Sequence, residues 1–248
     1  MAKQMSVLTL SGNIGRINFF KNRTGFQARE KGGVPKSRIM SDPKFARTRE
    51  NIAEFSNNAA AARMLKDAIR PAIQRFKDTR LHLRLTSRMM QVLKSDPVNV
   101  RGERQVAEGD WSLLRGLEMN GLTPLSGTLK MAYTISDGAT EWGIDVPAFI
   151  PKDDVLIPEG ASHMRVILAG AAVDFATGEK SFQIAQSAEV PVATPSAGLS
   201  LAVQKGGLPQ SHKIVLVGVE FLQVVNGEFY PLNNGSNASG AIVFTERS

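Results

Sequence analysis

The first alternation of apolar and polar residues lies between Leu8 and Gly33. It predicts two short strands, Arg16 to Lys21 and Phe26 to Glu30, folded back on each other across Asn22-Arg23-Thr24-Gly25. Asn and Gly suit the tight backbone bend that such a hairpin needs. Because a two-stranded ribbon is at best marginally stable in water, we expect this one to dock on another surface.

After Asp42 the apolar residues recur at spacings of three and four, which is the period of an α-helix. Asp42 followed by Pro43 predicts the helix start, because Asp caps free N–H groups and Pro suits the first helical position. Pro71 predicts a kink or break near Ile69. A further helix is predicted from about Thr79 to Lys94. The predicted apolar face before and after the break consists of Ile52, Phe55, Ala59, Ala62, Leu65, Ile69, Ile73 and Phe76.

From residue 126 onward the alternation has a period of two, which is typical of strands. Gly, Pro, Asn and Asp separate the runs, and Asn226-Gly227 is the clearest hairpin turn. Seven or eight short strands with regular turns predict an antiparallel β-sandwich, Ig-like or jelly-roll-like. The runs are Leu129 to Ile135, Glu141 to Phe149, His163 to Phe175, Lys180 to Val190, Leu199 to Val203, Lys213 to Val225, Phe229 to Leu232 and Ala241 to Thr245.

These patterns together predict an α+β fold in three parts. We expect a β-hairpin and basic arm over residues 1–40, a helical region over residues 41–119 and the antiparallel sandwich over residues 120–248. A chain of 248 residues with 42% hydrophobic content is long enough to bury a core.

Charge is distributed unevenly along the chain. Residues 1–50 hold 11 Lys/Arg and 3 Asp/Glu, residues 51–118 hold 12 and 8, and residues 119–248 hold 7 and 12. The net charges of the three segments are therefore +8, +4 and −5. A basic front and an acidic back suggest either a polyanionic partner or attraction between the front of one copy and the back of another. Lys and Arg that only solvate a helical face would give the same balance.

Candidate chemistry is sparse. The absence of cysteine excludes disulfides, thiolate catalysis and cysteine-ligated metals. His82, His163 and His212 are far apart and have no partner at a metal-binding spacing, so we expect them on the surface or in packing. Gly12-Asn-Ile-Gly15 lacks the third glycine of a dinucleotide fingerprint and predicts a turn. We therefore expect no catalytic residue, no cofactor and no metal.

The expected location is the cytoplasm. No apolar run approaches the roughly 20 residues that span a bilayer, so we expect no membrane span. The first residues also lack the pattern of a secretory signal. Export by another route, or inclusion in a particle, stays open as an alternative.

The function that we expect is non-enzymatic self-assembly. The basic hairpin of one copy would dock on the acidic sandwich of the next, whose edge strands can accept an added strand. A head-to-tail contact between different surfaces yields a filament, a tube or a ring. The expected assembly contacts are Arg16, Phe19, Phe20, Arg23, Phe26 and Arg29.

Nucleic-acid binding is the alternative function. The arm interleaves aromatic and basic residues, which a single-strand binder uses for stacking and for charge. Against this interpretation, Phe19 and Phe20 are adjacent and so point to opposite faces of a strand, which leaves at least one to pack on protein. No helix-turn-helix, zinc finger or RNP consensus accompanies them.

The chain also resembles a family of uncharacterised proteins common in Bacteroidota genomes, mainly over residues 8–120. The matching residues are Gly12-Asn-Ile-Gly15, Phe19-Phe20-Lys21, Thr24-Gly25-Phe26, Ala28-Arg29, Phe45-Ala-Arg-Thr-Arg-Glu50, Glu54-Phe55, Arg101-Gly102 and Asn120. Members of that family begin with a short G-x-x-G, an aromatic and basic hairpin, a Pro/Lys linker and a helix. The resemblance implies no activity and no site residue.

Overall fold

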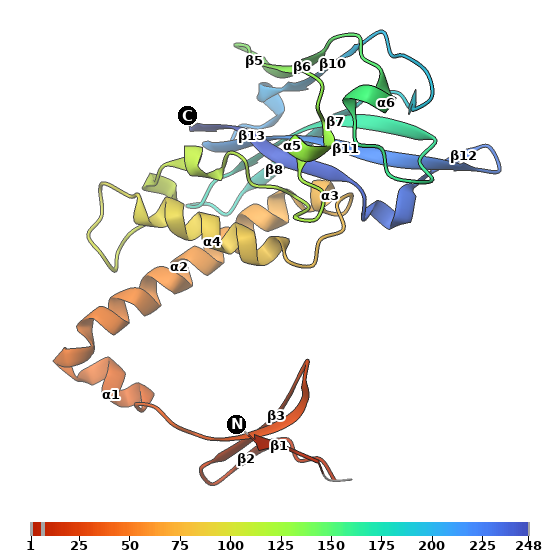
Figure 1. The fold of residues 1–248 in the computed structure, drawn as a ribbon. Helices are drawn as coiled ribbons and strands as arrows, with labels where there is room; N and C mark the ends of the chain where they lie inside the picture. Colours follow the sequence, from red (N-terminus) through yellow and green to blue (C-terminus); the bar gives the residue numbers. More distant parts are fainter. Residues whose placement is uncertain (1, 6–7, 248) are drawn as a thin grey trace. The chain divides into compact units, whose positions relative to one another are not determined.

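A computed structural model describes residues 2–5 and 8–247 of the chain (Figure 1). It confirms the α+β class: an N-terminal sheet, central helices and C-terminal antiparallel sheets follow one another along the chain. The chain divides into two compact units, Met1–Asn51 and Ile52–Ser248. The helices that follow residue 52 thus belong to the same unit as the C-terminal sheets, whereas the sequence pattern separated them at residue 119.

The N-terminal unit contains a four-stranded antiparallel sheet in the order β1-β4-β3-β2. Its strands are β1 (Ala2–Lys3), β2 (Gly12–Ile14), β3 (Ile17–Asn22) and β4 (Gly25–Glu30). The predicted hairpin is confirmed as β3 and β4, which close where Asn22 pairs with Gly25. Asn22 Oδ1 accepts hydrogen bonds from the N–H and hydroxyl of Thr24, at 2.9 and 2.7 Å. The expected two-stranded ribbon thus has one further strand on each side.

Helical structure begins within the stretch expected to be a basic arm. Helix α1 (Lys36–Ser41) precedes a 3-10 turn, η1 (Pro43–Phe45), and the long helix α2 (Ala46–Ala68). Asp42 caps the turn as predicted, since its carboxylate accepts a hydrogen bond from the N–H of Lys44 at 3.0 Å. Arg49 donates to the carbonyls of Ile39 and Asp42 at 2.8 and 2.9 Å, which ties α1 to the start of α2.

The predicted break near Ile69 is also confirmed. Helix α2 ends at Ala68, and Pro71 occupies the first turn of the short helix α3 (Arg70–Ile73), where its missing N–H costs nothing. Helix α4 (Leu81–Lys94) follows, close to the predicted residues 79–94. Its buried side chains recur at helical spacing and are Leu81, Leu85, Met89, Val92 and Leu93.

The predicted apolar face of α2 is wrong over its first half. Ile52 and Phe55 are exposed, whereas Glu54 and Asn58 are buried. The Glu54 carboxylate accepts a hydrogen bond from the N–H of Gly102 at 2.9 Å, and the Asn58 amide donates to the Thr86 carbonyl at 3.0 Å. Backbone groups far along the chain thus satisfy the hydrogen bonding of these two buried polar side chains. Hydrogen bonds decide which side of α2 is buried in its first half, and apolar side chains decide it from Ala61 onward.

Two antiparallel sheets make up most of the C-terminal unit. The smaller sheet has the order β10-β6-β5, with β5 (Thr134–Asp137), β6 (Glu141–Val146) and β10 (Leu199–Gln204). In the larger sheet β11 (His212–Val225) pairs with β7 (His163–Val173) at the centre. Strands β12 (Glu228–Pro231) and β13 (Ser239–Arg247) pair with β11, and β8 (Lys180–Gln186) and β9 (Val190–Pro191) pair with β7.

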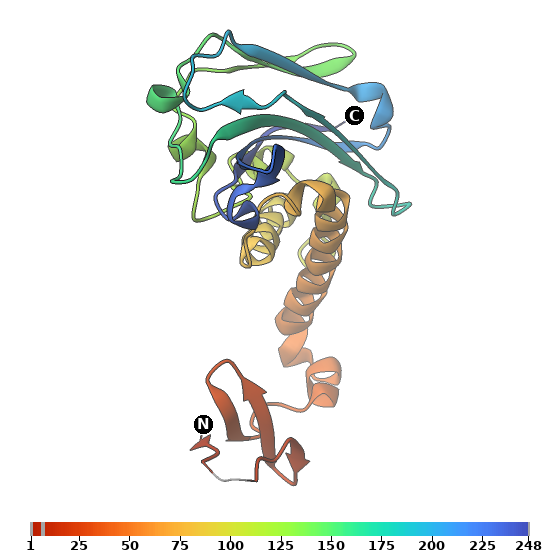
Figure 2. The same cartoon turned by 90° about the vertical axis from the view of Figure 1, so that its right-hand side faces the viewer.

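The larger sheet is buried on both faces (Figure 2). Leu168 and Val217 face the smaller sheet and pack with Trp142 and Ile144, which makes the expected sandwich. The alternate residues of β7 and β11 face helices α2 and α4 and form a second core. Helices therefore cover the face that a two-layer sandwich would leave to solvent. This explains why β7 and β11 are nearly continuous apolar runs.

Shorter helical segments connect these elements. The predicted strand over Leu129 to Ile135 is wrong except at its end. The short helix α5 (Leu125–Thr128) comes directly before this run. The backbone of Leu129 to Met131 then pairs with Asp154 and Val155, so strand β5 begins only at Thr134. The connecting segments are η2 (Val106–Glu108), η3 (Trp111–Leu114), α5 (Leu125–Thr128), α6 (Pro151–Asp154), η4 (Lys205–Gly207) and η5 (Leu232–Gly235).

Candidate interaction surface

The register of the N-terminal sheet gathers apolar side chains on one side. Residues directly opposite each other in an antiparallel pair share a face. Ile14 faces Ile17, Phe19 faces Ala28, and Phe26 faces Lys21, so alternation along β3 and β4 puts all of them on the same side. We call Ile14, Ile17, Phe19, Phe26 and Ala28 the apolar face. Ile14 and Ile17 are exposed, and the other three side chains are half-buried.

The N-terminal unit has no interior of its own among its described residues. Of residues 2–5 and 8–51, none is buried. A sheet is stabilised mainly when one of its faces is removed from water, by a helix, a second sheet or a partner. Among the described residues of its own unit, the apolar face therefore lacks the cover that such a face requires.

The opposite side of the same sheet is polar. Asn13, Asn18, Phe20 and Arg29 lie there, together with Lys3 of β1, and we call these five residues the polar face. The Arg29 guanidinium lies over the Phe20 ring at 5.3 Å, and Asn18 donates a hydrogen bond to Asn13 at 2.6 Å. A hollow of about 420 Å³ beside Arg29 is lined on this side by Asn13 and Asn18.

The structure does not bring the six predicted contact residues together. Phe19 and Phe26 belong to the apolar face, and Phe20 and Arg29 belong to the polar face. Arg23 lies in the turn between β3 and β4.

Arg16 lies in the turn between β2 and β3 and makes an exposed ion pair with Glu30 at 3.0 Å. An ion pair so exposed contributes little to stability. The preceding Gly15 has φ +54° and lies in this turn, whereas Gly12 to Ile14 form strand β2, so the turn predicted for the G-x-x-G is confirmed only at its last residue.

The sequence pattern did not identify Ile14 as part of the contact surface, nor Ile17 as its apolar neighbour on β3. Both lie at the tight turn that joins β2 to β3, and β2 has only three residues, of which one is glycine. The signal that would have found them is the G-x-x-G itself, interpreted as a second hairpin turn that continues the alternation of β3 back to Ile14.

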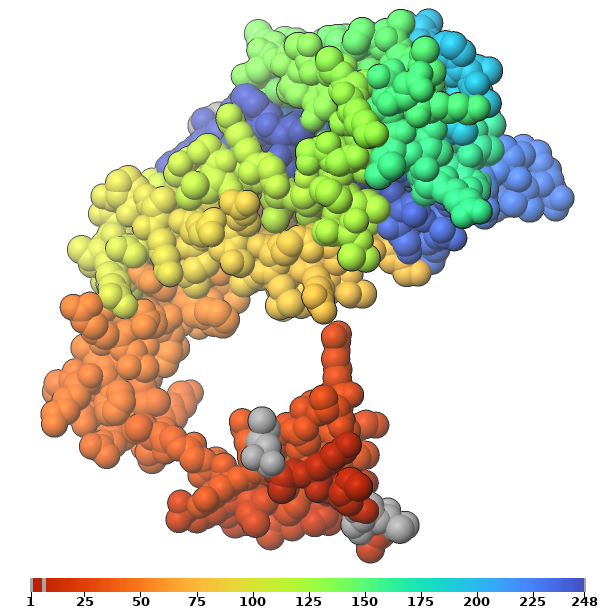
Figure 3. Space-filling view, viewed as in Figure 1, coloured from red at the N-terminus to blue at the C-terminus, as the bar shows by residue number. Residues whose placement is uncertain are grey.

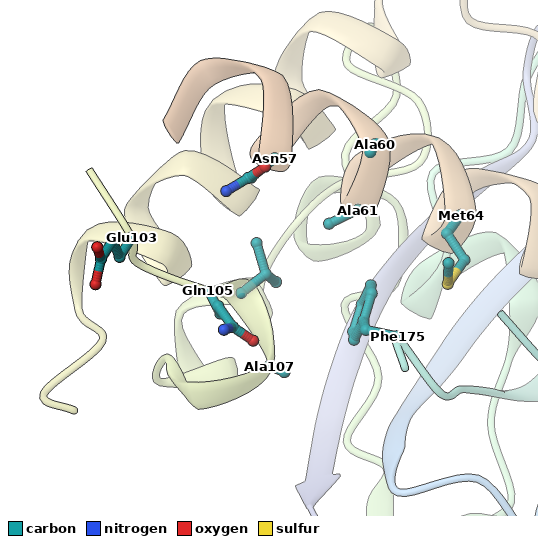
Figure 4. A pocket seen from close by; sticks show the side chains of 9 residues that line it. Asn57, Ala60, Ala61, Met64, Glu103, Gln105, Ala107 and Phe175 are labelled. Carbon is teal, nitrogen blue, oxygen red and sulfur yellow. The ribbon is translucent and has the colours of Figure 1, made fainter. Parts of the chain in front are cut away.

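A pocket in the C-terminal unit is lined mainly by apolar side chains (Figure 4). It has a volume of about 320 Å³ and lies between α2 and the η2 segment. Ala60, Ala61 and Met64 form one wall and Phe175 forms another, while Asn57 and Gln105 lie at the rim. Of the described residues that line it, Glu103 alone is ionisable.

The buried ionisable groups of this unit are paired or packed. The Glu220 carboxylate lies 2.9 Å from Arg75 and 3.7 Å from Arg165, which links the segment after α3 to β11 and β7. His212 packs between Trp111 and Phe175, with ring centroids 4.9 and 5.2 Å away, and its Nε2 lies 2.9 Å from the Ala107 carbonyl. Burial lowers the pKa of His212. These contacts join layers of the fold.

The other two histidines lie where they touch solvent. His82 is exposed on α4, and the ring of half-buried His163 contacts the edge of Phe229 at 4.8 Å. Within residues 2–5 and 8–247, no three His, Cys, Asp or Glu side chains are grouped so that they could hold a metal ion. None of the helices in the described part of the chain is long and apolar enough to cross a membrane.

Comparisons with family models, curated proteins and solved structures found no match to this chain. The resemblance to the Bacteroidota family therefore stays a prediction.

Proposed function

We propose that this chain is a structural protein that self-associates, and that the apolar face of its N-terminal sheet is the contact surface. The observation that carries the proposal is that no residue is buried within residues 2–5 and 8–51, so the sheet presents Ile14 and Ile17 to solvent beside the half-buried Phe19. Exposed apolar surface on a sheet is the usual sign of a missing partner. We propose a structural role rather than a catalytic one.

Charge supports a second copy of the chain as that partner. Residues 1–51 contain 11 Lys/Arg and 3 Asp/Glu, a net charge of +8, whereas residues 52–248 contain 19 and 20, a net charge of −1. Two basic N-terminal units repel each other, whereas residues 119–248 of another copy, with a net charge of −5, attract. A contact between two different surfaces repeats from copy to copy, so the expected product is a filament, a tube or a ring.

Light scattering over a wide concentration range, with negative-stain microscopy of the same samples, tests this proposal. We expect the molar mass of the wild-type protein to rise with concentration and polymers or rings to be visible. Ile17→Lys should reduce the association at least tenfold, because it places a charge in the apolar face. Glu30 lies opposite residue 17 and would pair with the new lysine, so the sheet itself should persist.

Ile150→Lys is the matched control. Ile150 is exposed to the same degree as Ile17, 46% against 45%, but lies in the C-terminal unit next to α6. It should associate like the wild type. A wild-type protein that stays monomeric at every concentration would overturn the proposal, and so would equal effects of the two substitutions.

A second candidate function, binding of single-stranded nucleic acid, is favoured by the polar face. The Arg29 guanidinium stacked on Phe20 offers both charge and an aromatic surface, which is the combination such proteins use. In gel-shift assays across a salt series, this function predicts an affinity that falls steeply as salt rises. Phe20→Ala should weaken binding by about tenfold, which corresponds to the loss of one stacked base. Ile17→Lys, on the other face, should not weaken it.

A further inference from the structure

The hairpin of β11 and β12 extends beyond the sheet to which it belongs (Figures 1 and 3). The pairing of β7 with β11 ends where His163 faces Leu222, and β13 leaves β11 earlier still. Residues 223–230 therefore form a two-stranded projection. Asn226 and Gly227 close it with φ of +53° and +84°, as a type I′ turn requires.

This projection carries exposed apolar side chains on both of its faces. Val224 and Phe229 lie opposite each other and share one face, and Val225 and Tyr230 lie on the other. All four are exposed. Glu228 is the only charged residue among residues 223–230. Like the N-terminal sheet, this ribbon presents exposed apolar side chains, although His163 packs against the Phe229 ring. Exposed apolar surface of this kind is typical of contact sites.

A hollow of about 450 Å³ lies at the base of the projection. Phe229, Leu222, Pro71 and Pro231 supply its apolar walls. The charged residues that also line it, Arg75, Arg165 and Glu220, are engaged in the ion pairs described above. The hollow is therefore suited to an apolar side chain rather than to an ion.

We propose that the β11–β12 projection and the adjacent hollow are the acceptor for the apolar face of a second copy's N-terminal sheet. This inference rests on the self-association proposed above and adds the surface on the other copy. Two observations select this occupant. Both surfaces present exposed apolar side chains on paired strands, and the regions that carry them have opposite net charge, +8 over residues 1–51 and −5 over residues 119–248.

The proposed acceptor assigns a partner to each apolar residue of the contact. Ile17 and Phe19 would cover Val224 and Phe229, and one aromatic side chain of the apolar face would enter the hollow. Glu228 lies on the opposite face of the projection, with Val225 and Tyr230, so charge would steer the encounter of the two copies and not enter this contact.

Disulfide trapping in the full-length chain tests the acceptor. Because the natural chain has no cysteine, each variant carries a single thiol. Ile17→Cys and Val224→Cys are purified separately, mixed and oxidised, and the linked dimers are measured on a non-reducing gel. We expect several-fold more of the 17–224 product than of the product from Ile17→Cys mixed with Ile150→Cys. The three replaced residues are matched in exposure, at 45%, 44% and 46%.

Three results would overturn the acceptor. Equal yields of the 17–224 and 17–150 products would show that the projection is not preferred. Predominant 17–17 product would indicate a face-to-face dimer. A cross-link that forms within a double variant, Ile17→Cys with Val224→Cys, but not between the mixed single variants would place the contact inside one molecule.

Light scattering of the wild-type protein separates the two proposals. Concentration-dependent association without 17–224 trapping removes the acceptor alone, whereas a wild-type protein that stays monomeric removes both.

Discussion

The two units differ in how their sheets are covered. In the C-terminal unit both faces of the large sheet are buried, one by helices and one by the smaller sheet. In the N-terminal unit no described residue is buried, although β3 and β4 pair with full register. The N-terminal sheet thus has paired strands without buried side chains among its described residues, whereas the large C-terminal sheet has both. The difference supports the proposal that a partner covers the N-terminal sheet, whereas the large sheet of the C-terminal unit is covered within its own unit.

Truncation of a core residue should have the largest effect. Leu168→Ala removes a fully buried side chain from β7 and should lower the free energy of unfolding of the C-terminal unit by about 3–5 kcal/mol. Urea unfolding followed by tryptophan fluorescence measures it, because Trp111 and Trp142 both lie buried in this unit. The control Ile150→Ala should change stability by less than about 0.5 kcal/mol. A loss below about 1 kcal/mol for Leu168→Ala would contradict the assignment of the core.

The next largest effect should be a difference between the two units in the rate of cleavage by trypsin. Trypsin has 11 Lys/Arg sites in residues 1–51, and no residue that the structure describes there is buried so as to resist local opening. In dilute protein we expect these sites to be cut on the order of a hundredfold faster than sites in β7 or β11. Mass spectrometry of timed digests identifies the first cuts. Equal rates in the two units would remove the contrast between them.

The first half of α2 offers a sharper comparison within one helix. Glu54→Ala leaves the N–H of Gly102 and the guanidinium of Arg104 without their partner, and should cost about 1–3 kcal/mol. Phe55→Ala, at the neighbouring exposed position, should cost less than about 0.5 kcal/mol. Urea unfolding of both variants tests this. A larger loss of stability for Phe55→Ala than for Glu54→Ala would favour the apolar face that the sequence pattern predicts.

Acid should weaken the C-terminal unit through His212. Burial lowers the pKa of His212 in the folded chain below the ordinary value of 6.5. As the pH falls through 6.5, the unfolded chain takes up this proton more readily than the folded one, so stability decreases. We expect the slope of Tm against pH between about 7.5 and 5.5 to be shallower in His212→Gln. An unchanged slope would mean that His212 does not contribute to the loss of stability in acid.

Much of the fold follows from local patterns. The turn at Asn22 to Gly25 and the long apolar runs of β7 and β11 predicted their elements closely, because each depends on neighbouring residues. Asn226-Gly227 likewise located the hairpin that we now propose as the acceptor. Burial of Glu54 was not predictable, since its partner Gly102 lies 48 positions further along the chain.

The division of the candidate contact residues between two faces also required more than composition. Phe19 and Phe20 were expected on opposite sides of a strand, and the register confirms this. Alternation along β3 alone puts Phe19 on the side of Ile17. The addition of Ile14 depends on the pairing of β2 with β3, which is set by a two-residue turn, and the addition of Phe26 and Ala28 depends on the pairing of β3 with β4.

Hydrogen exchange measured at several protein concentrations tests the central claim most directly. If the N-terminal sheet is completed by a second copy, the amides of β3 and β4 should exchange quickly in dilute protein and become protected as the concentration rises. The amides of β7 and β11 should stay protected at every concentration. Protection of β3 and β4 that does not change with concentration, while the protein remains monomeric, would contradict the claim.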